Sequence, residues 1–202
     1  MSDRAGGIRV TERETLYRGF LHVEKLKIDQ TLPDGRVAHL VREVHDHGHG
    51  AAILLYDAAR GVVVLVRQFR TGPYVAGDDP FLLEVPAGLL DGEAPGEAIC
   101  REAIEETGFF VAEAHRLFDV FASPGTLTEK ITLFAAFVSP TDRVTNGGGL
   151  DAESEHIEFV ELPLDEAFAK IGSGEIRDAK TVILLQWAMM NRAALDECRF
   201  PG

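Results

Sequence analysis

Acidic side chains crowd into one short segment of the chain, Pro95–Thr107, with a single arginine among them. The segment reads PGEAICREAIEET, and four of its thirteen residues are glutamates. Carboxylates at this spacing repel one another unless a cation lies between them. Several oxygen ligands on one rigid face are what Mg²⁺ or Mn²⁺ binds. The pattern therefore predicts a divalent-metal site, and the alternative interpretation is an amphipathic helix with a solvated acidic face.

The same segment carries the signals of a helix. Pro95 suits the first turn, and Gly108 suits the C-terminal stop. On a wheel of about 100° per residue, a stripe that we expect to be buried covers an arc of roughly 140°. The members of this stripe are Ile99, Cys100, Ala103, Ile104 and Thr107.

The carboxylates flank the buried stripe of this helix. Glu102 and Glu106 are one turn apart and lie together on one border, and Glu105 lies further out. Arg101 is four residues from Glu97 and four from Glu105, so it can bridge both. One arginine only partly offsets the repulsion, which favours the metal site over the solvated face.

Residues 88–109 resemble the signature of the Nudix hydrolases, G-x5-E-x7-R-E-U-x-E-E-x-G-U, in which U is a bulky apolar residue. The matching residues are Gly88, Glu93, Arg101, Glu102, Ala103, Glu105, Glu106, Gly108 and Phe109. The second half, REAIEETGF, fits at every position. The first half is one residue short, because four residues rather than five separate Gly88 from Glu93. The deletion falls in a loop, so we expect the metal-binding face to survive.

The resemblance implies roles for individual residues. Glu102 and Glu106 would bind the metal together with the backbone carbonyl of Ala87. Glu105 would hold a metal or orient the attacking water. The residues with a structural part in the motif would be Gly88, Glu93, Arg101 and Gly108.

The resemblance continues outside the motif. The segments LLEVPAG (82–88), ASPGTLTE (122–129) and GEIRDAKTVILLQW (174–187) are similar to those of the ADP-ribose and nucleoside-diphosphate-sugar pyrophosphatases, and closest to the branch that hydrolyses GDP-mannose. The implied fold is α+β, an α/β/α sandwich with a mixed β-sheet and a small N-terminal β extension. The implied reaction is metal-dependent cleavage of GDP-mannose to GMP and mannose 1-phosphate. ADP-ribose, giving AMP and ribose 5-phosphate, is the alternative substrate, and the intact carboxylates disfavour a sensor that binds without cleaving.

A long polar loop, residues 141–155, leads into the sequence ESEHI (153–157). Taken alone, it is a solvated acidic loop. It resembles the mobile loop of ADP-ribose pyrophosphatases that ends in E-x-E-x-I and supplies a catalytic base. The resemblance implies Glu153 as general base and Glu155 as metal ligand or alternative base. The run NGGG (146–149) would provide the flexibility that loop closure needs.

Substrate contacts are also implied by the resemblance. Arg42 and Arg70 lie at strand ends, where arginines of the family hold phosphates or sugar. Glu129 ends the ASPGTLTE segment and is assigned to the substrate with it. Tyr17 and Phe20 would stack on a nucleobase across a homodimer, since the N-terminal hairpin of this subgroup often packs on the partner subunit. Surface arginines and core aromatic residues are the alternatives.

Hydrophobic patterning predicts the elements that must position these residues. Strands are expected at residues 17–28, 37–44, 51–56, 61–68, 81–85, 117–121, 131–138 and 157–161, and further helices at 165–171 and 179–195. The absence of regular βαβ alternation favours a mixed sheet with helices on both faces. The first two strands form a hairpin. We assign residues 1–46 to a dimerising extension and residues 47–202 to the Nudix hydrolase domain.

The composition limits partners and compartment. A net charge of −13 argues against nucleic acid or an anionic membrane as partner, because both need a basic face. Cys100 and Cys198 are far apart and fit a reducing cytosol. The polar start, MSDRAGG, lacks a signal-peptide core. We therefore expect a cytoplasmic enzyme with a small-molecule substrate.

Overall fold

The computed structural model describes residues 7–150 and 156–201. It divides into two compact units. The N-terminal unit comprises Met1–His49 with Phe121–Lys130, and the main unit comprises Gly50–Val120 with Ile131–Gly202. The predicted sites in the acidic helix lie in the main unit.

The main unit is built on a seven-stranded sheet whose strand order is β10-β5-β4-β9-β8, with β6 paired to β5 and β7 paired to β4. β4 and β9 are parallel, whereas the pairs of β4 with β5 and of β5 with β10 are antiparallel. The strands are β4 (Gly50–Asp57), β5 (Val62–Phe69), β6 (Phe81–Glu84), β7 (Ala87–Leu89), β8 (His115–Phe121), β9 (Lys130–Phe137) and β10 (Glu158–Pro163). The sheet is therefore mixed, as the sequence predicts.

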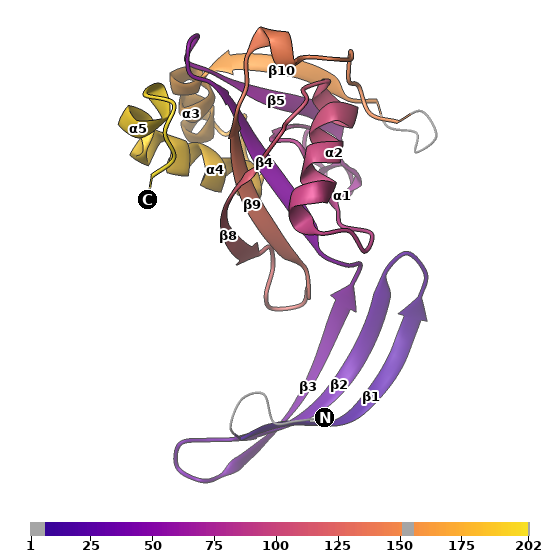
Figure 1. Cartoon of the computed structure of the whole chain (residues 1–202). Coiled ribbons are helices and arrows are strands. Elements are labelled where there is room, and N and C mark those ends of the chain that lie inside the picture. The colour runs from indigo at the N-terminus through magenta and orange to yellow at the C-terminus, as the bar shows by residue number, and fades with distance from the viewer. Residues whose placement is uncertain (1–6, 151–155, 202) are drawn as a thin grey trace. The chain divides into compact units, whose positions relative to one another are not determined.

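Every residue of β4 is buried, because helices cover both faces of the sheet. One face packs on α2 (Pro95–Thr107), and the other packs on α3 (Leu164–Ser173) and α4 (Ala179–Met190). Figure 1 shows α2 on one side of β4 and α3 and α4 on the other. Alternate residues of β4 enter the two cores, with Leu54 on the α4 side and Ile53 on the α2 side. The predicted α+β sandwich is confirmed.

Two short helices and a 3₁₀ turn complete the main unit: α1 (Thr71–Ala76), α5 (Arg192–Asp196) and η1 (Pro140–Asp142). The single helix predicted at 179–195 is two helices, because the chain breaks at Asn191. α1 is not among the helices predicted from the sequence. Among the described residues, no helix has the length and apolar character needed to cross a membrane.

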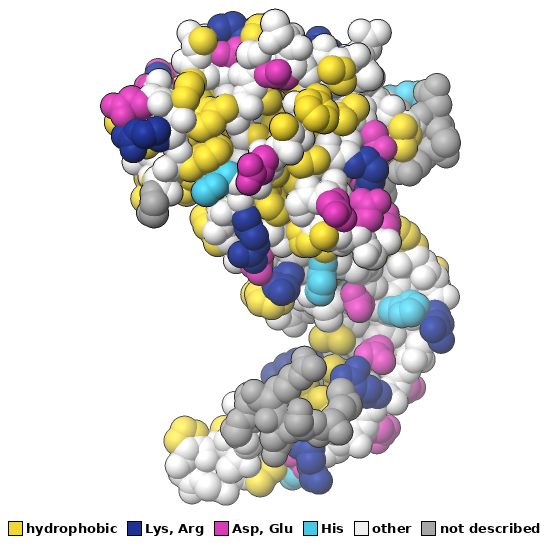
Figure 2. Space-filling model, viewed as in Figure 1, with side chains coloured by type: hydrophobic (Ala, Val, Ile, Leu, Met, Phe, Trp, Pro, Cys, Tyr) yellow, Lys and Arg dark blue, Asp and Glu magenta, His cyan; other side chains and the backbone are white. Residues whose placement is uncertain are grey.

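The N-terminal unit contains an antiparallel sheet of three strands, β1 (Ile8–Arg18), β2 (His22–Thr31) and β3 (Val37–Asp46). A two-stranded hairpin was predicted, and the strand expected at 17–28 is interrupted by the turn between β1 and β2. β1 was not predicted because it is almost wholly exposed and so shows no hydrophobic periodicity. Its side chains form ion pairs with those of β2. Ion pairs join Lys27 to Glu12 at 2.7 Å and Arg13 to Glu24 at 2.5 Å. Figure 2 shows both basic and acidic side chains on the surface of this unit.

Candidate active site

α2 has the ends that the sequence predicts. Pro95 lies in the first turn, and Gly108 caps the helix in the left-handed region with φ 82°. Glu106 is buried, with 2% of its surface exposed, while the side chain of Glu102 is 15% exposed. The two carboxylates therefore lie at the border of the core, where water screens their repulsion poorly.

β7 brings backbone polar groups to the same carboxylates. The N–H of Ala87 donates to Glu106 Oε2 at 3.1 Å. Ala87 pairs with Ala52, and the N–H of Ile53 donates to the Pro86 carbonyl at 3.0 Å. This register makes Ala52 and Ala87 a non-hydrogen-bonded pair, so the N–H and C=O of Ala87 both point away from β4. The Ala87 carbonyl thus lies on the side of the strand that faces Glu106.

Gly88 leaves room for the side chain of Glu102. A Cβ at position 88 would lie 2.2 Å from the carboxyl carbon of Glu102, a distance that no real contact reaches. Any other residue at position 88 would therefore force the Glu102 side chain to turn away from its present position. The glycine that opens the motif therefore sets the position of one carboxylate.

Arg101 holds three carboxylates at once. Its guanidinium lies 2.8 Å from Glu105, 3.0 Å from Glu102 and 3.3 Å from Glu93. Partial burial lowers the pKa of Arg101, but the charge of Glu102, the Glu93 hydrogen bond and the other nearby carboxylates outweigh burial, so the net pKa is raised. Arg101 bridges to Glu93, in the turn before the helix, in place of the expected Glu97. The shorter loop of the motif thus still delivers Glu93 to the arginine.

The glycine run after η1 docks on the last turn of α2. The N–H of Gly148 donates to the Glu106 carbonyl at 2.9 Å, and the N–H of Gly149 donates to the Glu105 carbonyl at 3.0 Å. A Cβ at Gly147 would lie 2.6 Å from the Glu106 carbonyl oxygen. The flexibility expected of these glycines stays a prediction. In the structure they also allow close approach of two backbones.

All four terminal carbonyls of α2 have partners, since Gly108 N–H binds the carbonyl of Ile104 and Arg143 Nε binds that of Thr107. The turn that carries Glu105 and Glu106 is consequently fixed by the segment that follows η1.

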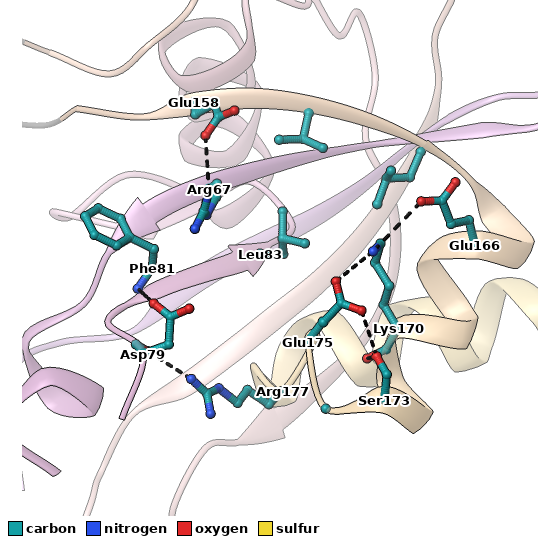
Figure 3. A pocket seen from close by; sticks show the side chains of 13 residues that line it. Arg67, Asp79, Phe81, Leu83, Glu158, Glu166, Lys170, Ser173, Glu175 and Arg177 are labelled. Atoms are coloured by element: carbon teal, nitrogen blue, oxygen red, sulfur yellow. Dashed lines mark hydrogen bonds and ion pairs between the residues drawn. The ribbon is translucent and has the colours of Figure 1, made fainter. Parts of the chain in front are cut away.

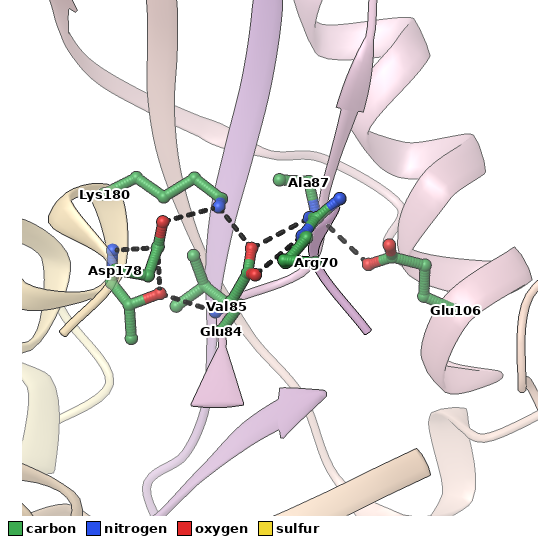
Figure 4. Close-up of polar contacts among 8 residues, drawn as sticks. Arg70, Glu84, Val85, Ala87, Glu106, Asp178 and Lys180 are labelled. Atoms are coloured by element: carbon green, nitrogen blue, oxygen red, sulfur yellow. Dashed lines mark hydrogen bonds and ion pairs between the residues drawn. The ribbon is translucent and has the colours of Figure 1, made fainter. Parts of the chain in front are cut away.

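Arg70 lies beside the carboxylate face of α2 (Figure 4). It follows β5, and its Nε and Nη2 donate to both oxygens of Glu84 at 2.7 and 2.9 Å. Lys180, from the first turn of α4, donates to the same carboxylate at 2.5 Å. Burial lowers the pKa of Arg70, but its hydrogen bond to Glu84 and the charges of Glu84 and Glu106 outweigh burial, so the net pKa is raised. Glu84 and Lys180 were missed by the sequence analysis, although Glu84 lies within LLEVPAG and Lys180 within GEIRDAKTVILLQW.

The remaining predicted substrate residues lie in the N-terminal unit. The ring of Phe20, 78% exposed, stacks on His47 with centroids 6.3 Å apart. Glu129 lies 3.5 Å from His47 Nε2, so His47 connects two residues predicted separately. Tyr17 is exposed on β1, and Arg42 on β3 donates to the Val41 carbonyl at 2.8 Å. His47 was not predicted as a site residue, although the sequence places it in an alternating run with His45 and His49.

The donor set in the main unit fits a hard divalent cation. Glu102, Glu106 and the Ala87 carbonyl are oxygen donors, and the Ala87 N–H fixes Glu106 from one side. Within residues 7–150 and 156–201, no group of three His, Cys, Asp or Glu side chains is gathered tightly enough to hold a metal by itself. Glu153 and Glu155 lie outside the described residues, so the structure places neither.

A pocket of about 560 Å³ lies on the α3 side of the sheet (Figure 3). Its lining includes Arg67, Phe81, Leu83 and Lys170, and none of the predicted site residues. Its charges are matched within the pocket, as where Lys170 binds Glu175 at 2.7 Å. The chemistry predicted from the motif therefore belongs to the α2 face and not to this pocket.

The fold and the carboxylate face of α2 define a Nudix protein, and residues 46–185 match the family model of the NUDIX domain. The chain belongs to the Nudix family, which confirms the family predicted from its motif. It is 45% identical over 184 residues to the GDP-mannose pyrophosphatase of Pectobacterium atrosepticum, covering 91% of this chain and 94% of that protein. It is 44% identical over 181 residues to the protein of the same name from Klebsiella pneumoniae, covering 89% and 90%. The counterpart from Cronobacter sakazakii is 44% identical over 180 residues, covering 89% and 93%.

Proposed function

We propose that this Nudix protein hydrolyses the pyrophosphate bond of GDP-mannose, giving GMP and mannose 1-phosphate. The observation that carries the proposal is the joint position of Glu102, Glu106 and the Ala87 backbone on one face. Identity of 44–45% to proteins named GDP-mannose pyrophosphatase supports the choice of substrate.

The chain and its substrate are both negative, so cations must lie between them. We propose Mg²⁺ as the natural cofactor, with Mn²⁺ as a substitute, held by Glu102, Glu106 and the Ala87 carbonyl. When bound, such a cation neutralises phosphate charge and lowers the pKa of a coordinated water. Arg70 would bind a phosphate through Nη1, because Nε and Nη2 are occupied by Glu84. Arg101 bridges Glu102 and Glu105 through one nitrogen, Nη1, and so offsets their mutual repulsion.

We assign the general base to Glu153, with Glu155 as metal ligand or alternative base. The support is the resemblance of ESEHI to the base-bearing loop of the family. Gly148 and Gly149 start this loop from a fixed point on the last turn of α2. Whichever glutamate acts must take a proton from the attacking water.

A substrate panel tests the reaction. Purified protein with Mg²⁺ is given GDP-mannose, ADP-ribose and other nucleoside diphosphate sugars, and the products are separated and quantified. We expect the largest kcat/KM with GDP-mannose and equal amounts of GMP and mannose 1-phosphate. Preference for ADP-ribose would move the assignment to the alternative substrate. Lack of cleavage of every sugar nucleotide would overturn the proposal.

We also propose a homodimer that works in the cytoplasm. The support for a dimer is the exposure of large apolar side chains on the N-terminal unit, among them Leu16, Tyr17, Phe20 and Val41. Light scattering should give twice the chain mass of 22.1 kDa. A variant that lacks residues 1–46 should be monomeric or aggregated with weak substrate affinity, and a monomeric truncation of full activity would refute this assembly.

A further inference from the structure

Glu84 ends β6 and is nearly fully buried, with 1% of its surface exposed. Burial raises the pKa of its carboxyl, but the Arg70 hydrogen bond and the charges of Lys180 and Arg70 outweigh burial, so the net pKa is lowered. Glu84 is therefore ionised at neutral pH. Its side chain is 2% exposed, that of Lys180 is 12% and that of Arg70 is 40%. The carboxylate thus lies behind two cations, and Arg70 is the one that reaches solvent.

A second set of bonds fixes Lys180 relative to Glu84. Asp178 caps α4 by accepting from the Thr181 N–H at 3.0 Å, and it also accepts from Lys180 at 3.0 Å. The Thr181 hydroxyl in turn accepts from the N–H of Val85 at 2.9 Å. Val85 directly follows Glu84, so the start of α4 is attached to the strand that carries the carboxylate.

Stability alone does not explain this arrangement. Replacing a buried ion pair by well-packed apolar residues is often neutral or stabilising. Hydrogen bonds to the one carboxylate of Glu84, by contrast, fix the positions of both Arg70 and Lys180. A bidentate arginine is also held in one plane, which leaves Nη1 in a fixed direction.

We propose that Glu84 is a positioning residue that holds Arg70 and Lys180 side by side for the substrate phosphates without touching the substrate itself. The proposal deepens the proposed function and rests on it. Its effect is on binding: displaced cations meet the phosphates equally poorly in the ground state and the transition state. Loss of such uniform binding raises KM and leaves kcat nearly unchanged.

The test compares Glu84→Gln with Asp57→Asn. Asp57 is also 1% exposed and bound by an arginine, Arg60, at 2.5 Å, but it lies at the opposite end of β4 from Ala52 and β7. Kinetics use the nucleoside diphosphate sugar that the wild type cleaves fastest. If the wild type does not cleave GDP-mannose, the substrate assignment is refuted, but the inference about Glu84 is still tested with the substrate that is cleaved.

We expect Glu84→Gln to raise KM at least tenfold with kcat within about threefold of wild type. Asp57→Asn should lower Tm to a similar degree and leave KM unchanged. The Arg70 Nε–H signal in ¹⁵N NMR, which needs no catalysis, should lose its protection from solvent exchange in Glu84→Gln alone. The groups that face Lys180 are Glu84, Asp178 and Arg70. Because the negative charge of Glu84 raises the pKa of Lys180, its removal in Glu84→Gln should lower that pKa. The alkaline limb of kcat/KM should therefore move to lower pH.

Glu84→Asp keeps the charge and covers the case in which the glutamine variant does not fold. Its shorter side chain cannot reach both cations, so we expect an intermediate rise in KM. An unchanged KM in a Glu84→Asp variant whose Arg70 Nε–H has lost its protection would overturn the proposal. The proposal would also be overturned if Glu84→Gln lowered Tm as much as Asp57→Asn does but left KM and the protection of the Arg70 Nε–H unchanged.

Discussion

Glu106 accepts a hydrogen bond of 3.1 Å from the backbone N–H of Ala87, which ties the most buried carboxylate of α2 to the strand beside it. The bond uses only Oε2. The bond holds the Glu106 carboxylate on the side of β7 to which the Ala87 carbonyl also points. One backbone contact therefore brings two of the oxygen donors proposed for the cation to the same side of the strand.

Replacing Glu106 by glutamine should nearly abolish turnover and leave the fold intact. The amide oxygen can still accept from Ala87, but the charge proposed to bind the cation is gone. Steady-state kinetics, Mg²⁺ titration calorimetry and circular dichroism measure the three properties. Glu97→Gln is the matched control, because Glu97 lies exposed in the first turn of the same helix. Unimpaired activity of Glu106→Gln would remove it from the metal site.

Replacing Gly88 by alanine should displace Glu102. The new Cβ would lie 2.2 Å from the Glu102 carboxyl, so that side chain must turn away. We expect metal affinity and kcat/KM to fall together by at least tenfold. Gly96→Ala is the control, because the nearest atom to its Cβ would be 4.0 Å away and the substitution favours a helix. Equal behaviour of the two variants would show that Gly88 has no special part.

Glutamine at position 153 should lower kcat by roughly 10²–10⁴, the usual contribution of a general base. KM and metal affinity should change little, since a base acts on the water and not on binding. Single-turnover kinetics of Glu153→Gln and Glu155→Gln distinguish the two candidates, because the larger loss identifies the base. Near wild-type rates in both variants would transfer the role to the helix, with Glu105 next.

Stability should depend on pH through Glu84. Its pKa in the folded protein is lowered below the usual glutamate value of about 4.3. Its contribution is therefore complete above that value and is lost as the pH falls toward the folded-state pKa. The free energy of unfolding, measured in urea at pH 7 and pH 3.5, should differ less between wild type and Glu84→Gln at the lower pH. A difference that grows on acidification contradicts the assignment.

The helix that carries the chemistry was predictable from sequence because its signals are local. Pro95, Gly108 and the 3.6-residue period all act within one element. The bridge of Arg70 and Lys180 through Glu84 was not predictable, since it joins residues 14 and 96 positions apart in the chain. β1 was missed for a different reason, because its cross-strand charges give no hydrophobic period. The close approach of the glycine run to α2 was not predictable, because close approach and flexibility demand the same residue.

The cap on α2 has a consequence for how the protein is made. Its last turn is completed by Arg143, Gly148 and Gly149, which follow the helix by about forty positions, as the separation of 41 between Ile104 and Thr145 illustrates. During synthesis at about 5–20 residues per second, α2 leaves the ribosome seconds before the segment that fixes Glu105 and Glu106. Until that segment docks, Gly108 alone caps the helix, and the carbonyls of Glu105, Glu106 and Thr107 lack these partners. The turn that carries Glu105 and Glu106 is therefore completed late in synthesis.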